Sequence, residues 1–261
     1  SNLDLSLKYQ ESLFLEGAKK LNLKVENIPR LSSINKDEKI YKNSMSKTYL
    51  SDYIKNGGKT LLSTEVEKVF FKNKRWAVKC FDLINRKKFE LKTKYLFVCC
   101  GSIYTNALLI KSNLKKMKSF EKINNFKFHP MIKVIAEYDE KVQDKNCDVH
   151  SYQITDFYPK YIIGNAASSI QFMLPNFNSQ KEIYNMIKKN WRHMSTFHST
   201  MSLGTGKLYY DKIFTNDIIS TYKFKDFEKI QIIDSFLNLS KFIFSTGAKK
   251  IIPIMKNSKE L

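Results

Sequence analysis

The residues best placed to do chemistry are Cys100 and Gly101, which follow the apolar run Tyr95–Cys99. A helical pattern containing Ala107 and Leu108 begins directly after them. Glycine lets a ligand approach the backbone closely, and the free amides at a helix start favour anionic oxygen. The arrangement predicts a phosphate-bearing cofactor beside Cys100 and Gly101, with an ordinary turn as the alternative.

The other residues of catalytic type form no recognisable set. His193 and His198 are five positions apart, which would place them on different faces of a helix and not beside one metal ion. The four cysteines include no C-x-x-C pair, so neither a metal site nor a disulfide framework is predicted. Gly204–Lys207 fails the spacing of a G-x-x-x-x-G-K-[ST] phosphate loop and is expected to be a turn. The catalytic residues are therefore unknown from spacing alone.

Several strand patterns precede Cys100 in the chain. The pair Gly57-Gly58 is a breaker, and a β-rich run from Lys59 to Phe71 follows it. Arg75–Asp82 and Lys88–Leu91 alternate in hydrophobicity and are separated by short polar turns, so they predict an antiparallel meander. Tyr95–Cys99 is almost continuously apolar, which predicts a strand buried on both faces.

The rest of the chain mixes helical and strand patterns around a basic linker, Lys115–Lys127, where the domain boundary is predicted. Asp226 is the predicted N-cap of a helix that ends at Thr246. The apolar stripe of this helix contains Ile230, Ile233, Leu237 and Phe244. The other predicted helices are Leu3–Leu21, Met45–Lys55 and Gln180–Trp191, and the predicted strands are Met131–Tyr138, Asp148–Ile154, Tyr161–Phe172 and Gly206–Ile213.

Composition and charge limit the class of protein. A hydrophobic content of 43% excludes a disordered chain, and no window approaches the roughly 20 apolar residues of a membrane span. The net charge of +20 raises nucleic-acid binding as an alternative. However, the 45 basic residues include only four arginines, the residue that base and phosphate recognition favours. The scattered lysines are interpreted as solvated surface, so no specific nucleic-acid partner is predicted. Unpaired cysteines indicate a reducing, cytoplasmic location.

Several short motifs resemble those of one enzyme family. Val98–Ser112 is similar to the "VVLAAGAIxTPxLLLxSG" segment of the glucose–methanol–choline (GMC) oxidoreductases, FAD-dependent enzymes that oxidise alcohols. Lys47–Leu50 and Glu65–Val69 resemble that family's "TYL" helix and its adenine-contacting strand. His129-Pro130 and Val134–Glu140 resemble its "HPxxxVxGxFDE" entry into the substrate domain. Departures from these patterns occur at Asn106, Asn113 and Phe128, which replace a proline, a glycine and an acidic residue.

The resemblance implies a fold of the α/β and α+β classes. Residues 1–114 would form the second half of an FAD-binding domain with a β-meander, and residues 115–261 part of an antiparallel-sheet substrate-binding domain with flanking helices. FAD is the implied cofactor, with the Val66 backbone at the adenine and with Cys100 and Gly101 beside the cofactor. The implied reaction transfers hydride from the CH–OH group of a small-molecule alcohol to the flavin.

Two parts of the family pattern have no counterpart in these 261 residues, namely the G-x-G-x-x-G turn and the C-terminal block with the catalytic histidine. We therefore expect an internal portion of such an enzyme, inactive alone and partnered by the flanking segments of the same enzyme. Two alternatives stay open. One is a basic nucleic-acid-binding protein. The other is a flavoenzyme of another family that shares the meander, and the His129-Pro130 motif argues against this second alternative.

Overall fold

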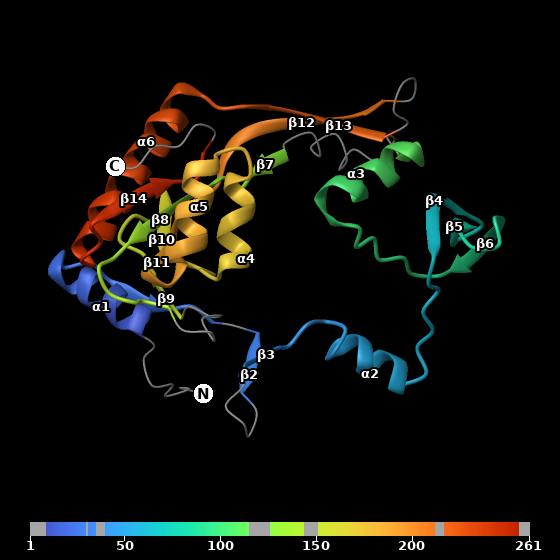
Figure 1. Cartoon of the computed structure of the whole chain (residues 1–261). Helices are drawn as coiled ribbons and strands as arrows, with labels where there is room; N and C mark the ends of the chain where they lie inside the picture. Colours follow the sequence, from blue (N-terminus) through green and yellow to red (C-terminus); the bar gives the residue numbers. More distant parts are fainter. Residues whose placement is uncertain are drawn as a thin grey trace. The chain divides into compact units, whose positions relative to one another are not determined.

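The computed structural model describes residues 9–29, 31–34, 40–114, 126–143, 151–211 and 217–255. The chain divides into two compact units, each assembled from separated stretches of sequence (Figure 1). Unit 1 comprises residues 1–30, 129–203 and 224–261, and unit 2 comprises residues 31–128 and 204–223. Both units mix helices with antiparallel strands, in agreement with the coarse fold class, while the boundary after residue 114 stays a prediction. Within the described ranges, none of the helices has both the length and the apolar character of a membrane span.

A six-stranded antiparallel sheet is the centre of unit 1, in the order β1-β9-β10-β11-β8-β14. Strand β11 lies inside this sheet and pairs Phe197 with Asn165 of β10 on one side and with Val134 of β8 on the other. No local pattern predicts β11, because its serines, threonines and histidine are not typical of a buried strand. The strand bounds are β1 Val25–Asn27, β8 Met131–Glu137, β9 Tyr152–Ile154, β10 Tyr161–Ala166, β11 Met194–Met201 and β14 Lys250–Pro253.

Helices cover both faces of this sheet. In β8, Ile135 packs into the cluster formed with α4 and α5, whereas Val134 and Ala136 pack into the cluster formed with α1 and α6. Neighbouring residues face opposite sides because side chains alternate along a strand. The rings of Phe14 in α1 and Phe242 in α6 meet edge-on, with centroids 4.8 Å apart. The helix bounds are α1 Tyr9–Lys20, α4 Ile170–Met173, α5 Lys181–Asn190 and α6 Asp226–Ser245, with 3-10 turns η3 Leu174–Phe177 and η4 Trp191–His193.

The predicted strand Tyr161–Phe172 is wrong in its second half, because β10 ends at Ala166 and α4 begins at Ile170. Ser168 explains the change of direction. Its hydroxyl donates to the carbonyl of Ala166 and accepts from the N–H of Thr196, each at 2.8 Å. These two bonds satisfy backbone groups that a continued strand would otherwise have paired. The predicted strand Asp148–Ile154 overlaps β9, and its residues 148–150 lie outside the described residues.

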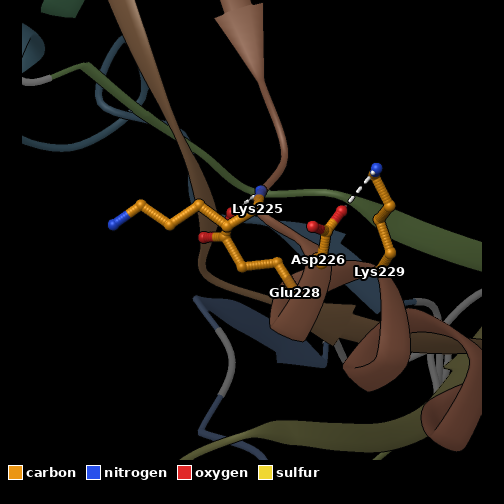
Figure 2. Close-up of polar contacts among 4 residues, drawn as sticks. All are labelled: Lys225, Asp226, Glu228 and Lys229. Carbon is orange, nitrogen blue, oxygen red and sulfur yellow. Dashed lines mark hydrogen bonds and ion pairs between the residues drawn. The ribbon is translucent and has the colours of Figure 1, made fainter.

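Figure 2 shows the start of α6. The Glu228 carboxylate accepts a hydrogen bond from the Lys225 N–H at 2.7 Å, and Asp226 forms an ion pair with Lys229 at 2.8 Å. The helix begins at Asp226, and the extended residue before it, Lys225, occupies the N-cap position. The prediction of Asp226 as N-cap is therefore wrong by one position. Glu228 reaches back to the N-cap amide, as the acidic residue of a capping box does.

The apolar stripe predicted for α6 points away from the sheet. Ile230, Ile233, Leu237 and Phe244 are all exposed, and Ile230 keeps 67% of its surface accessible. The side of α6 that packs on the sheet instead buries Ser235, Leu239, Phe242 and Ile243. Periodicity alone cannot distinguish these two stripes, because each repeats every three to four residues. The exposed set Ile230, Ile233, Leu237 and Phe244 is called the outer stripe below.

Unit 2 contains the predicted meander. Strands β4, β5 and β6 form an antiparallel sheet in chain order, with bounds β4 Thr64–Lys72, β5 Arg75–Asp82 and β6 Lys87–Thr93. The first turn places Asn73 and Lys74 at positive φ. In the second turn the Asp82 carboxylate accepts hydrogen bonds from the N–H groups of Ile84 and Asn85, both at 2.9 Å. The prediction of an antiparallel meander is thus confirmed.

After β6 the chain runs through Tyr95–Cys99 without pairing with any strand that the structure describes. Leu96 and Val98 pack against the cluster of the meander and α3, whereas Tyr95 and Phe97 are 78% and 86% exposed. The prediction of a strand buried on both faces is therefore wrong for this chain, because nothing among the described residues covers its second face.

The remaining elements of unit 2 are small. Helix α2, Tyr49–Lys55, buries none of its residues, and it overlaps the helix predicted over Met45–Lys55. The other bounds are β2 Ser32–Ile34 paired with β3 Ile40–Lys42, helix α3 Gly101–Lys111, and the sheet β13-β12-β7 of Asp217–Lys223, Leu203–Asp211 and Phe126–Phe128.

Candidate functional site

The predicted cofactor residues Cys100 and Gly101 form the start of α3. Cys100 has φ −85° and ψ 12°, and Gly101 has φ +76°, a left-handed conformation that strains residues with a Cβ. A Cβ built on Gly101 would meet no described atom within 4 Å. Backbone conformation, and not crowding, therefore explains the glycine here. The close approach of a ligand to this residue stays a prediction.

The start of α3 is electrostatically suited to an anion. The first N–H groups of a helix lack partners within the helix and lie at the positive end of its dipole. No acidic residue occupies the first turn of α3, and no side chain hydrogen-bonds at its N-cap. The thiols of Cys99 and Cys100 are exposed, so the helix start is reachable from solvent. The arrangement can hold a phosphate oxygen through backbone amides.

The other end of α3 is fixed to the meander. The Val69 N–H of β4 donates to the Ser112 hydroxyl at 2.9 Å, and Leu108 packs with Val69 and Val78. Ser112 closes the segment Val98–Ser112, so one motif contains both the candidate ligand-binding turn and the anchor of its helix. Ser112 is a positioning residue that was not predicted from the sequence. Its partner Val69 lies 43 residues earlier in the chain, so the local pattern carries no signal of this hydrogen bond.

Val66, the predicted adenine contact, lies where the pairing of β4 with β5 is irregular. Val66 pairs with Cys80 and Lys68 with Lys79, so Glu67 is the extra residue of a β-bulge. A bulge redirects neighbouring side chains and loosens the local ladder. Val66 is 37% exposed, whereas Cys80 opposite it is buried, and burial raises the pKa of the Cys80 thiol.

The three predicted cofactor residues thus share unit 2 but are not brought into direct contact. Among the described residues, no hydrogen bond joins Val66 to Cys100 or Gly101. The roles predicted for these three residues stay predictions. The structure places Val66 in the meander and the other two residues on the helix that packs against it.

His193 and His198 belong to different elements of unit 1. His193 ends η4 with its Nδ1 atom 3.1 Å from the Asp139 carbonyl oxygen, while His198 lies in β11 against Gly164 of β10. The two residues are therefore not on a shared helix, as the spacing argument had assumed. In the parts of the chain that the structure describes, no group of three or more His, Cys, Asp or Glu side chains is arranged to hold a metal ion.

Two comparisons with known proteins show what the chain is similar to. Residues 5–131 match the family model described as GMC oxidoreductase. An uncharacterized GMC-type oxidoreductase of Sinorhizobium fredii (strain NBRC 101917 / NGR234), y4nJ, is 24% identical over 217 residues. That alignment covers 81% of this chain and 42% of the relative. The chain thus spans about two fifths of the length of the curated relative it matches.

The resemblance to the GMC oxidoreductases that the motifs predicted is confirmed by both comparisons. The matched range contains Val66, Cys100 and Gly101, together with His129-Pro130. The alignment with the relative is longer than residues 5–131, so the similarity continues into the second half of the chain. The chain is accordingly related to a class of oxidoreductases.

Proposed function

We propose that this chain supplies part of an FAD-dependent oxidoreductase that acts on the CH–OH group of a small-molecule alcohol. The supporting observation is that the segment matched by the family model contains the uncapped start of α3, with Gly101 at φ +76°. A motif match and a structural feature suited to a phosphate therefore coincide at the same residues. No comparable observation favours the nucleic-acid-binding alternative.

The described residues fit such a cofactor. The backbone amides at Cys100 and Gly101 would hold an anionic oxygen, and the absence of acidic residues in the first turn of α3 avoids repulsion. The backbone of Val66 would meet the adenine. When bound, FAD accepts a hydride from the alcohol carbon. The task of this chain's residues is to bind and orient the cofactor and to exclude water from it.

The exposed face of Tyr95 and Phe97 supports the proposal that unit 2 is half of a larger cofactor domain. Large apolar side chains on one face of an extended segment are normally covered by a neighbouring element. The relative's additional length offers sequence for such an element. We propose that flanking segments of the same enzyme add strands beside Tyr95–Cys99, and that the chain without them is inactive.

Substitution of Gly101 tests the cofactor site. The longest product of the native gene that contains these residues would be purified with Gly101→Val and its flavin-to-protein ratio measured by absorbance. We expect a loss of most of the flavin, because a β-branched residue is strained at φ +76° and would shift the amides.

Gly247→Val is the matched control. Gly247 has φ +95° and, like Gly101, would bring its Cβ within 4 Å of no described atom, but it lies in unit 1 after α6. The control should keep its flavin despite a similar local strain. Full flavin content in Gly101→Val, or equal loss in both variants, would contradict the assignment of Gly101 to the cofactor site.

A further inference from the structure

The outer stripe of α6 is an apolar surface that the packing of unit 1 does not use. Ile230, Ile233, Leu237 and Phe244 recur at intervals of three, four and seven residues, so they share one side of the helix. That side is opposite the residues that pack on the sheet, which include Leu239 and Phe242. α6 is therefore apolar on two opposite sides, although a surface helix needs only one apolar side to pack.

The charges beside the outer stripe indicate what covers it. Asp234 and Lys241 are both exposed on the same side of α6 as Leu237. The Asp234 carboxylate is held in place, since it accepts hydrogen bonds from the Tyr161 hydroxyl at 2.8 Å and from the Asn238 amide at 3.1 Å. One fixed negative charge and one positive charge thus flank the apolar centre.

These positions match a second copy of the same helix in antiparallel orientation. Residues at equal distances on either side of a crossing point face each other in such a pair. With the crossing between Leu237 and Asn238, Asp234 of each copy lies opposite Lys241 of the other. Ile230 and Ile233 of one copy then lie beside Phe244 of its partner. A parallel pair would instead place Asp234 on Asp234 and Lys241 on Lys241, which like-charge repulsion disfavours.

We propose that the outer stripe of α6 is the centre of a two-fold dimer interface in which two α6 helices pack antiparallel across Leu237. The proposal is independent of the flavin site in unit 2. A lipid surface offers no reciprocal pairing of Asp234 with Lys241, so a second copy of the chain accounts for more of the observed features. One face of a 20-residue helix is small beside the roughly 800 Å² per partner of a standard interface, so we expect reversible association.

Sedimentation equilibrium of the full 261-residue chain over a wide concentration range tests the proposal. We expect a monomer–dimer equilibrium in the unmodified chain. Ile233→Lys should shift it to the monomer, because a charge would be buried against the partner's apolar surface. Lys241→Glu should weaken it less, on the order of tenfold, because it faces the partner's Asp234.

Phe172→Lys is the matched control. Phe172 and Ile233 are both 59% exposed, but Phe172 belongs to α4, which packs with the opposite face of the sheet. The control should dimerise like the unmodified chain, and circular dichroism should show that every variant is folded. A monomer at all concentrations would overturn the proposal. So would a dimer that survives Ile233→Lys, or one that Phe172→Lys dissociates equally.

Crosslinking tests the orientation separately. Leu237→Cys, introduced together with Cys99→Ala, Cys100→Ala and Cys147→Ala, places one thiol at the crossing point of each copy. Mild oxidation should yield a covalent dimer, whereas Phe227→Cys in the same background should not, because it lies far from the crossing. Equal crosslinking at both positions would exclude the antiparallel arrangement.

Discussion

Strand β11 in unit 1 and the segment Tyr95–Cys99 in unit 2 differ in sequence and in surroundings. β11 contains serines, threonines and a histidine, yet Ser195, Thr196 and Ser199 are almost fully buried in it. Tyr95–Cys99 is nearly all apolar, yet its Tyr95 and Phe97 side chains are exposed. β11 has a paired strand on each side and helices over both faces, whereas the apolar segment has neither.

Burial of these two segments is decided by the strands and helices that pack around them, and not by their amino-acid composition. A polar strand can be buried where the backbone ladder on both sides satisfies its N–H and C=O groups. An apolar segment is exposed where nothing covers it. Unit 1 supplies its own neighbours. Unit 2 supplies them only on the side where Leu96 and Val98 meet the meander.

The largest effect should come from the core of unit 1. Phe242→Ala should lower the free energy of unfolding by about 3–5 kcal/mol, because Phe242 is fully buried between α1 and the sheet. Phe97→Ala should change it by less than about 0.5 kcal/mol. Urea unfolding followed by Trp191 fluorescence in a Trp76→Phe background measures the stability of unit 1 for Phe242→Ala. The fluorescence of Trp76 in a Trp191→Phe background measures the stability of unit 2, which contains Phe97. A large effect of Phe97→Ala would show that the segment is covered after all.

Thiol reactivity distinguishes the exposed Cys99 and Cys100 of unit 2 from its buried Cys80. In the native chain with Cys147→Ala, Cys99 and Cys100 should react quickly with iodoacetamide, and Cys80 only after unfolding. The longest product of the native gene should protect Cys99 and Cys100 as well, because we propose that flanking segments and cofactor cover them. Mass spectrometry of tryptic peptides identifies the modified residues. Unchanged reactivity in the longer product would contradict the proposed partner strands.

A smaller effect is expected at the anchor of α3. Ser112→Ala removes the acceptor of the Val69 N–H and should destabilise unit 2 by about 1 kcal/mol. Ser102→Ala, on the exposed first turn of the same helix, is the control and should be nearly neutral. With Trp191→Phe, the fluorescence of Trp76 in β5 reports the unfolding of unit 2. Equal effects of the two substitutions would mean that the Ser112 bond contributes nothing.

The smallest effect is expected for binding of the chain to nucleic acid. Several exposed lysines pair with acids, as Lys88 does with Glu67 and Lys249 with Asp139. Binding to a labelled oligonucleotide should be weak and lost in moderate salt, with a salt slope that falls by roughly 0.7–0.9 for each missing phosphate contact. Sequence-dependent affinity that survives physiological salt would revive the alternative reading of the +20 charge.

Local patterns predicted local structure well. The meander followed from alternation and short turns, and the helix after Gly101 followed from the glycine and the apolar positions beyond it. The same sequence could not predict β11, because its burial depends on β8 and β10, which lie far from it in the chain. Nor could it predict which of two stripes of α6 faces the sheet, since Phe14 and Phe197 settle that choice.

In the candidate site, too, some residues could be predicted from local sequence and others could not. Gly101 could be singled out because one residue type carries the signal, and its positive φ gives the glycine a reason. Ser112 was missed because its role is a hydrogen bond to Val69, 43 residues earlier in the chain. A bond between distant residues leaves no trace in a local pattern.

The pairing of α1 with α6 has a consequence for the making of the protein. Lys20 donates to the carbonyl of Ser245 at 3.1 Å, across a separation of 225 residues. At about 5–20 residues per second, a ribosome needs roughly 11–45 seconds to synthesise that stretch. During this interval Phe14 and Ala18, which are buried in the finished unit, have no α6 to pack against. During synthesis, α1 therefore exists without its packing partner until α6 has been made.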